Sequence, residues 1–133
     1  DWVQTIASIK HAELFNQACE RLSKKRNVCI QVNIDREQSK SGILIEDLDD
    51  LIVNILPLNN LILRGLMAIP SKINALKENI NSYKILKAEY DRLSSKYLHL
   101  DTLSIGMSND YKLALDNGSN MIRIGALIFG KRK

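Results

Sequence analysis

Two short segments near the carboxyl end of the chain combine a glycine turn with residues that suit anion binding. The first, Leu103–Asp110, reads LSIGMSND, and in it a predicted strand passes through Gly106 into a predicted helix. Ser108 is placed to cap that helix, and Asp110 falls in its first turn. Because the first backbone N–H groups of a helix lack intrahelical partners, such a turn is a natural anion site. The alternative is an ordinary capped helix.

The second segment, Met121–Ala126, reads MIRIGA and again ends a predicted strand in a glycine. Gly125 lets the backbone approach a ligand closely. In (β/α)₈ barrels the loops after the seventh and eighth strands commonly bind phosphate, so two such turns on consecutive strands favour a phosphate site. Arg123 either lies near that ligand or is a core arginine paired with a neighbouring carboxylate, and the sequence leaves both interpretations open.

Two earlier segments place polar residues or glycine at strand positions. Gln31 and Asn33 share one face of a predicted strand, because side chains alternate along it. Asn33, at the strand end, either hydrogen-bonds a ligand ring or holds the following loop, which contains Lys40-Ser41-Gly42. Gly65, within Arg64–Pro70, indicates close packing or a close backbone approach.

Other local signatures of chemistry are missing from the sequence. There is no Gly-x-x-x-x-Gly-Lys-Ser/Thr loop and no Gly-x-Gly-x-x-Gly fingerprint, which weakens a nucleotide-binding function. No Ser-His-Asp or Cys-His set is recognisable, so no catalytic residue is assigned. His11 and His99 lie in unrelated segments without ligand spacing, so no metal site is expected.

The elements that position these segments alternate between strand and helix five times. Apolar residues recur at helical spacing between the strands, most clearly from Ile73 to Tyr97. Regular alternation favours a parallel sheet covered by helices, either an open doubly wound sheet or part of a (β/α)₈ barrel. Polar residues near strand centres favour the barrel, with a ligand at its mouth. The predicted strands cover residues 2–6, 28–34, 61–67, 102–105 and 121–124.

Composition places the chain among globular proteins with one domain. Its 133 residues are 45% hydrophobic and 26% charged. A net charge of +4 permits anionic partners without requiring nucleic acid, and no apolar run is long enough to span a membrane. Cys19 and Cys29 fall on apolar faces, which indicates buried reduced thiols. With no export signal pattern at the start, these thiols suit a cytoplasmic protein.

Four stretches, in this order, resemble the pyridoxal phosphate homeostasis protein family, whose fold is similar to the N-terminal barrel of alanine racemase. They are QVNI with KSG (Gln31–Gly42), RGLMAIP (Arg64–Pro70), LSIGMSND (Leu103–Asp110) and MIRIGALIFG (Met121–Gly130). The resemblance covers essentially the whole chain. It implies an α/β fold of the (β/α)₈ TIM-barrel type, present here as a partial barrel of about five β/α units.

The resemblance implies binding of pyridoxal 5′-phosphate (PLP). The Ser108 hydroxyl and the backbone at Gly125 and Ala126 would hold its phosphate. Position 126 is usually threonine in the family, so Ala126 lacks a hydroxyl donor worth roughly 1.5–3 kcal/mol, and a lower affinity is expected. Carried over to this chain, the cofactor-binding residues are Asn33, Met107, Ser108, Arg123, Gly125 and Ala126.

The cofactor-bearing lysine of the family lies on an early strand, and no segment of this chain matches it. A complete barrel runs to about 250 residues. Residues 1–133 are therefore expected to be the C-terminal part of a single PLP-binding barrel domain, with strands four to eight of eight and without the strand that carries the lysine. Five strands leave two open edges, so the chain is expected to self-associate.

The function that the resemblance implies is a non-catalytic carrier or regulator of intracellular PLP and amino-acid pools, with the phosphate side of the site in this chain. One alternative is a PLP-dependent, racemase-like barrel enzyme acting on amino acids, which racemisation of alanine by the complete protein would favour. Another is a purely structural interaction domain, which failure of the complete protein to bind PLP would favour.

Overall fold

The computed structural model describes residues 1–71 and 80–130, and all five predicted strands are present in it. The helix predicted from Ile73 is confirmed from Asn81 onward, and its first residues lie outside the described ranges. The elements in chain order are β1 (Trp2–Ile6), α1 (Ile9–Arg21), β2 (Arg26–Val32), the 3-10 turn η1 (Ile45–Asp47), α2 (Leu48–Ile55), β3 (Leu61–Ala68), α4 (Asn81–Lys96), β4 (Thr102–Met107), α5 (Tyr111–Asp116), β5 (Met121–Arg123) and α6 (Ala126–Phe129).

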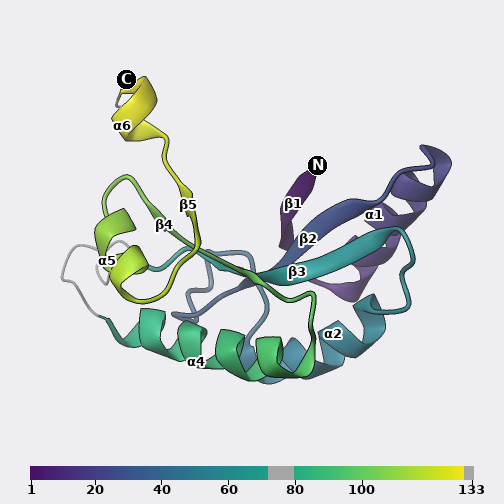
Figure 1. The fold of residues 1–133 in the computed structure, drawn as a ribbon, viewed down its shortest axis with the longest axis horizontal. Helices are drawn as coiled ribbons and strands as arrows, with labels where there is room; N and C mark the ends of the chain where they lie inside the picture. The colour runs from purple at the N-terminus through teal and green to yellow at the C-terminus, as the bar shows by residue number, and fades with distance from the viewer. Residues whose placement is uncertain (72–79, 131–133) are drawn as a thin grey trace.

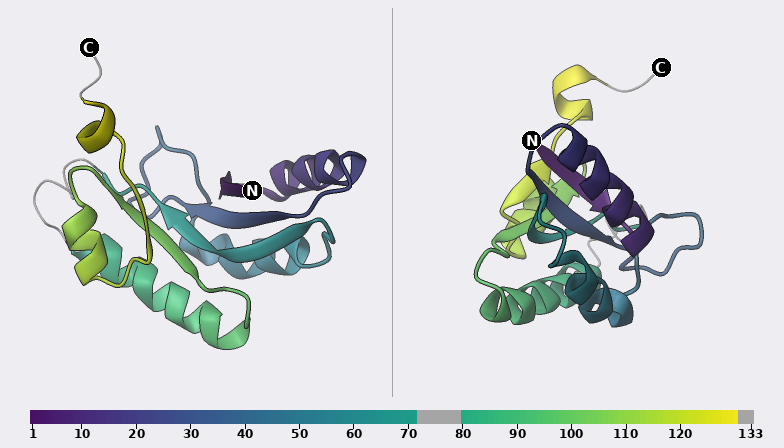
Figure 2. Two further views of the ribbon diagram at one scale, coloured as in Figure 1. Left: turned by 45° about the horizontal axis from the view of Figure 1, so that its top comes forward. Right: turned by 90° about the vertical axis from the view of Figure 1, so that its right-hand side faces the viewer.

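The five strands are all parallel and lie in the order in which they follow one another in the chain (Figure 1). Right-handed crossovers between such sequential neighbours place their helices on the same face of the sheet. α2 and α4 accordingly lie side by side beneath the strands (Figures 1 and 2). A doubly wound sheet would reverse its strand order partway. The chain is therefore a half-barrel of the (β/α)₈ type, as the polar strand residues predicted.

The hydrophobic core lies between the sheet and the helices. Val28, Ile30 and Leu103 of the strands are almost completely buried, in one cluster with Ile52 of α2 and Leu86 of α4. These helix residues belong to the apolar stripes that the helical spacing predicted. Full burial of each such side chain contributes about 1.5–3 kcal/mol, so this cluster is the main support of the half-barrel.

Gly65 marks the close approach of two strands. A Cβ atom built on Gly65 would lie 1.7 Å from the carbonyl oxygen of Thr102 on β4. Next to it, the pairing of β2 with β3 shifts register between Val28 and Cys29, which leaves Arg64 as an extra residue in β3. The prediction that Gly65 indicates a close backbone approach is therefore confirmed.

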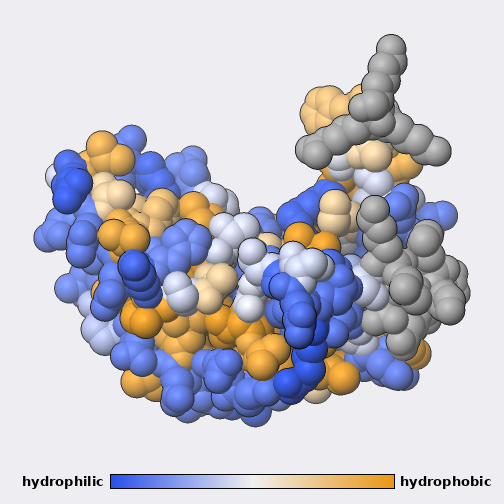
Figure 3. Space-filling model, turned by 180° about the vertical axis from the view of Figure 1, so that it is seen from behind, coloured by the Kyte–Doolittle hydropathy of each residue, from blue (hydrophilic) through white to orange (hydrophobic). Residues whose placement is uncertain are grey.

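The two edges of the half-barrel are open within the described residues, because β1 pairs only with β2 and β5 only with β4. Figure 3 shows a broad hollow between the end that carries α1 and the end that carries α6.

α6 projects from the body of the molecule (Figures 1 and 2), and its Leu127, Ile128 and Phe129 are 63%, 68% and 86% exposed. Three large apolar side chains exposed on one turn indicate an interaction surface.

Both cysteines are free and buried, as their apolar surroundings predicted. Burial raises the pKa of the Cys29 thiol to about 12. Across residues 1–71 and 80–130, no group of three or more His, Cys, Asp or Glu side chains is arranged to hold a metal ion. In the same part of the chain, no helix combines the length and hydropathy that a membrane span needs.

Candidate functional site

The carboxyl ends of β4 and β5 bring the two predicted glycine turns together. Met107, the last residue of β4, pairs with Arg123, the last residue of β5. Just beyond them, the Ser108 hydroxyl accepts hydrogen bonds from the backbone N–H groups of Gly125 and Leu127, each at 3.3 Å. The two turns therefore lie side by side, which is what their places on consecutive parallel strands predicted.

The side chain of Ser108 forms hydrogen bonds with this neighbouring turn rather than with the helix that follows it. α5 begins at Tyr111, and Asp110 occupies the cap position. The prediction that Ser108 caps the helix is therefore wrong. Because a hydroxyl can donate its own proton while it accepts N–H bonds, Ser108 retains a donor for an anion at this place.

Neither strain nor crowding among the described residues requires a glycine at position 125. Its φ of −118° is open to any residue, and no described atom outside residues 124–126 lies within 4 Å of a Cβ built on it. The missing side chain leaves open space beside the Gly125 N–H and the Ser108 hydroxyl. Backbone N–H groups and a hydroxyl around an open space form an arrangement that can hold phosphate oxygens.

The turn after β4 is shaped by Gly106 and Asp110. Gly106 has a φ of +104°, and a Cβ built on it would lie 2.6 Å from the Cβ of Ala114 on α5. The Asp110 carboxylate accepts the N–H of Met107 at 2.8 Å and the hydroxyl of Tyr83 at 2.6 Å. Glycine lets α5 pack closely against the strand end, and the carboxylate fixes the turn between them.

Arg123 is held beneath this turn by oxygen atoms of the neighbouring strands. Its guanidinium donates to the Ala68 carbonyl at 2.9 Å, to the Ser104 carbonyl at 3.0 Å and to the Ser104 hydroxyl. Among the described residues these acceptors are carbonyl and hydroxyl oxygens, so the predicted alternative of a carboxylate hydrogen-bond partner is wrong. Burial lowers the pKa of Arg123 from its ordinary value, and the charge of Asp110 opposes that shift.

Ser104 extends these contacts across the inner face of the half-barrel. Its hydroxyl donates to the side-chain oxygen of Gln4 on β1 at 2.6 Å, and the Gln4 amide donates to the sulfur of Met121 at 2.9 Å. Polar side chains thus link β1, β4 and β5 beneath the mouth. Ser104 falls within the predicted strand 102–105, where a polar side chain favoured a barrel, but nothing local to Gln4 distinguished it from other polar residues.

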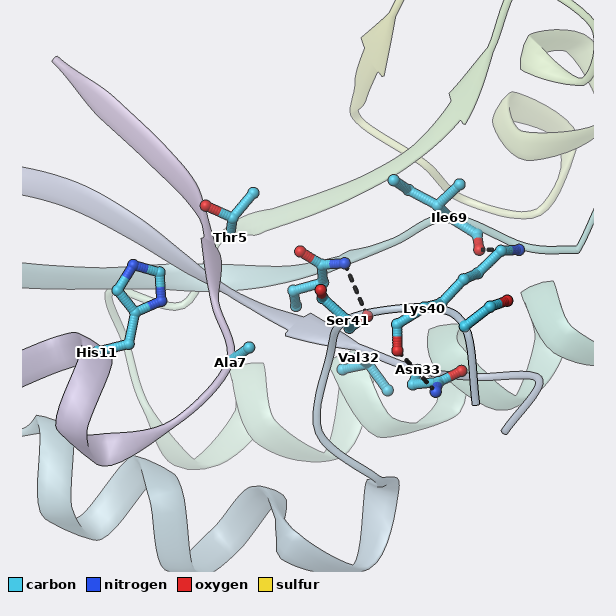
Figure 4. A pocket seen from close by; sticks show the side chains of 10 residues that line it. Thr5, Ala7, His11, Val32, Asn33, Lys40, Ser41 and Ile69 are labelled. Carbon is cyan, nitrogen blue, oxygen red and sulfur yellow. Dashed lines mark hydrogen bonds between the residues drawn. The ribbon is translucent and has the colours of Figure 1, made fainter. Parts of the chain in front are cut away.

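A cavity of about 500 Å³ opens beside the ends of β1, β2 and β3, and Asn33 lines it (Figure 4). The Asn33 amide donates to the carbonyl of Glu37 at 2.8 Å and to that of Lys40 at 3.3 Å. Gln31 likewise donates to the carbonyl of Ser41 at 2.8 Å. Asn33 therefore holds the loop, one of the two roles predicted for it, while its contact with a ligand stays a prediction.

Arg64 lies away from these turns. Its guanidinium donates to Asp101 and to the side chain of Asn27, and it lies 5.0 Å above the ring of Trp2. The hydrogen bond to Arg64 lowers the pKa of the Asp101 carboxyl, and the same bond raises the pKa of Arg64. Arg64 therefore ties neighbouring strands together and is not part of the candidate site.

The chain is thus an α/β half-barrel of five parallel β/α units, and two glycine turns meet at the carboxyl edge of its sheet. The family model of the alanine racemase N-terminal domain matches residues 1–133, so the chain belongs to that family. The Pyridoxal phosphate homeostasis protein of Escherichia coli (strain K12) is 40% identical over 132 residues, covering 99% of this chain and 56% of that protein. That of Haemophilus influenzae is 40% identical over 134 residues, with the same coverage. The chain thus spans just over half the length of these relatives.

Solved structures show the same relationship. PipY of Synechococcus elongatus PCC7942 matches with a TM-score of 0.88 without PLP and 0.84 with PLP bound, at 27% and 26% identity, over 98% of this chain and 61% of PipY. The alanine racemase of Clostridium difficile 630 matches with a TM-score of 0.77 over 98% of this chain and 36% of the racemase. Its 16% identity shows the fold alone. The resemblance carried by the four motifs is confirmed.

Proposed function

We propose that this chain supplies the phosphate side of a PLP site in a non-catalytic protein of intracellular PLP and amino-acid homeostasis. The observation that carries the proposal is the Ser108 hydroxyl, with the N–H groups of Gly125 and Leu127, beside the open space at Gly125. Two similarities support it. PipY was solved with PLP bound, and the curated relatives carry the name pyridoxal phosphate homeostasis protein.

In this proposal the chain's own residues bind and orient the phosphate, while PLP supplies an aldehyde that condenses with amines. Ser108 donates its hydroxyl proton, and Gly125 and Ala126 offer backbone N–H groups. Each hydrogen bond to a charged oxygen is worth about 1.5–3 kcal/mol. The cation of Arg123, fixed beneath the turns, lowers the electrostatic cost of the phosphate charge. The remaining residues proposed to lie near the cofactor are Asn33 and Met107.

Binding of pyridoxamine 5′-phosphate and of pyridoxamine by the intact protein tests the proposal. Both ligands lack the aldehyde, so surface lysines do not react with them, and they differ only in the phosphate. Equilibrium dialysis is expected to give roughly a hundredfold preference for the phosphorylated ligand, because at least two charged hydrogen bonds are at stake. Equal affinities would contradict the phosphate site. Racemisation of alanine by the intact protein would contradict the non-catalytic role and favour a racemase-like enzyme.

We further propose that the chain of 133 residues self-associates, because both edges of its sheet are unpaired among the described residues and the apolar side chains of α6 are exposed. Sedimentation velocity at low micromolar concentration is expected to show dimers or larger species. Phe129→Glu, which places a charge on α6, should shift the population toward monomer. Leu98→Glu is the control, since Leu98 is 95% exposed and precedes β4 at the other end of the strands. A cooperatively folded monomer at this concentration would contradict the proposal.

A further inference from the structure

Tyr83 and Asp110 form a buried pair behind the turn that carries Ser108. Tyr83 lies in the first turn of α4 and is 1% exposed, and Asp110 is 7% exposed. The Tyr83 hydroxyl donates to one oxygen of the Asp110 carboxylate at 2.6 Å, and the other oxygen accepts the Met107 N–H at 2.8 Å. One carboxylate thus joins a helix on the outer layer to the backbone of the proposed phosphate-binding turn.

Asp110 holds Met107 through two separate bonds. Besides the carboxylate contact, the backbone N–H of Asp110 donates to the Met107 carbonyl at 3.1 Å. Together these bonds close a tight turn over the two residues between them, Ser108 and Asn109. The place of the Ser108 hydroxyl, opposite the N–H groups of Gly125 and Leu127, therefore depends on how Asp110 is held.

Tyr83 is the side chain that orients the Asp110 carboxylate. Burial and the hydrogen bond to Asp110 raise the pKa of Tyr83 above its ordinary value, so its hydroxyl stays protonated and can donate. A hydrogen bond to an ionised acceptor away from water is short and strongly directional. Without it the carboxylate keeps its bond to Met107 but loses the second contact that fixes its rotation.

The same turn of α4 also holds the loop after β2. Ser82, next to Tyr83 in sequence, donates its hydroxyl to Asp35, and Asp35 accepts the backbone N–H of Ser71 as well. Consecutive residues of one helix thus hold a carboxylate after β2 and a carboxylate after β4. This arrangement fixes the turn of Ser108 relative to the loop that Asn33 organises.

We propose that Tyr83 and Asp110 are positioning residues for the phosphate: they hold the turn that presents Ser108 and do not touch the ligand. The inference rests on the proposed phosphate site and deepens it by naming the groups that preorganise it. A binding constellation keeps its geometry only when its own residues are held by surrounding packing and hydrogen bonds. The pair adds such support from α4, an element outside the two glycine turns.

Tyr83→Phe in the intact protein removes one hydroxyl and little else. Its affinity for pyridoxamine 5′-phosphate is expected to fall roughly three- to tenfold, the effect of one lost hydrogen bond, while its affinity for pyridoxamine stays unchanged. Tyr90→Phe is the matched control, because it removes the same group from the same helix about two turns away. Asp110→Asn, which keeps the shape but removes the charge, is a second variant expected to act in the same direction.

A double-mutant cycle with Ser108→Ala separates positioning from a general loss of stability. If Tyr83 acts through Ser108, Tyr83→Phe has little further effect on phosphate-ligand affinity once Ser108 is alanine. Additive losses, or parallel losses for both ligands, would overturn the inference. A wild-type protein that does not distinguish the ligands would overturn the phosphate site and this inference with it. Full preference retained in both Tyr83→Phe and Asp110→Asn would overturn the inference alone.

Discussion

Replacement of Gly65 by alanine is expected to destabilise the fold by about 4 kcal/mol or more, a large share of the roughly 5–15 kcal/mol that stabilises an ordinary domain. The added Cβ would lie 1.7 Å from the carbonyl oxygen of Thr102 and 2.6 Å from its carbonyl carbon. The atoms that the new Cβ would meet belong to the backbone of Thr102 and not to the flexible end of a side chain. β3 and β4 would therefore have to separate. Urea unfolding followed by circular dichroism measures the loss.

The matched control for this substitution is Gly125→Ala. It adds the same methyl group at a position where no described atom outside residues 124–126 lies within 4 Å of the new Cβ. Its φ of −118° suits alanine, so the urea midpoint of this variant is expected to stay near that of the wild type. A Gly65→Ala protein with a wild-type midpoint would contradict the close approach of β3 to β4.

The order of the elements was predictable because parallel β/α units repeat one simple pattern in the sequence. Strand ends were less predictable, and β2 shows why. The apolar run suggested a strand to Ile34, yet β2 ends at Val32. The Asn33 side chain accepts the backbone N–H of Glu37 at 3.0 Å and donates to its carbonyl, so the chain turns there instead of continuing the sheet.

The two glycine turns could be predicted, but the partners of their side chains could not. A local rule assigned Ser108 to the helix that follows it, whereas its contacts lie 17 and 19 residues further along, on the next β/α unit. Tyr83 fitted an apolar helical stripe, and the spacing of apolar residues carries no information about the hydrogen-bond partner of its hydroxyl. Its partner Asp110 is 27 residues away. Contacts between units follow from the packing of neighbouring β/α units in the sheet, which spacing within a segment does not encode.

A negative charge at Ser108 is expected to remove the binding of phosphate ligands almost completely. In Ser108→Asp a carboxylate would lie beside the N–H groups of Gly125 and Leu127 and accept the Gly125 N–H that is proposed for the phosphate. At about 4 Å and an effective dielectric constant of 20, two unit charges repel by about 4 kcal/mol. Affinity for pyridoxamine 5′-phosphate should therefore fall roughly a hundred- to a thousandfold in equilibrium dialysis, with pyridoxamine unaffected.

Two other variants are needed to interpret the affinity of Ser108→Asp. Ser95→Asp adds the same charge on the exposed side of α4 and should leave both affinities unchanged. Ser108→Ala removes one hydrogen bond without adding charge, so its loss should be about tenfold and clearly smaller than that of Ser108→Asp. If the aspartate variant binds as well as the alanine variant, no phosphate lies at Ser108. The open space at Gly125, a position where no crowding among the described residues calls for glycine, would then have to accommodate a group without negative charge.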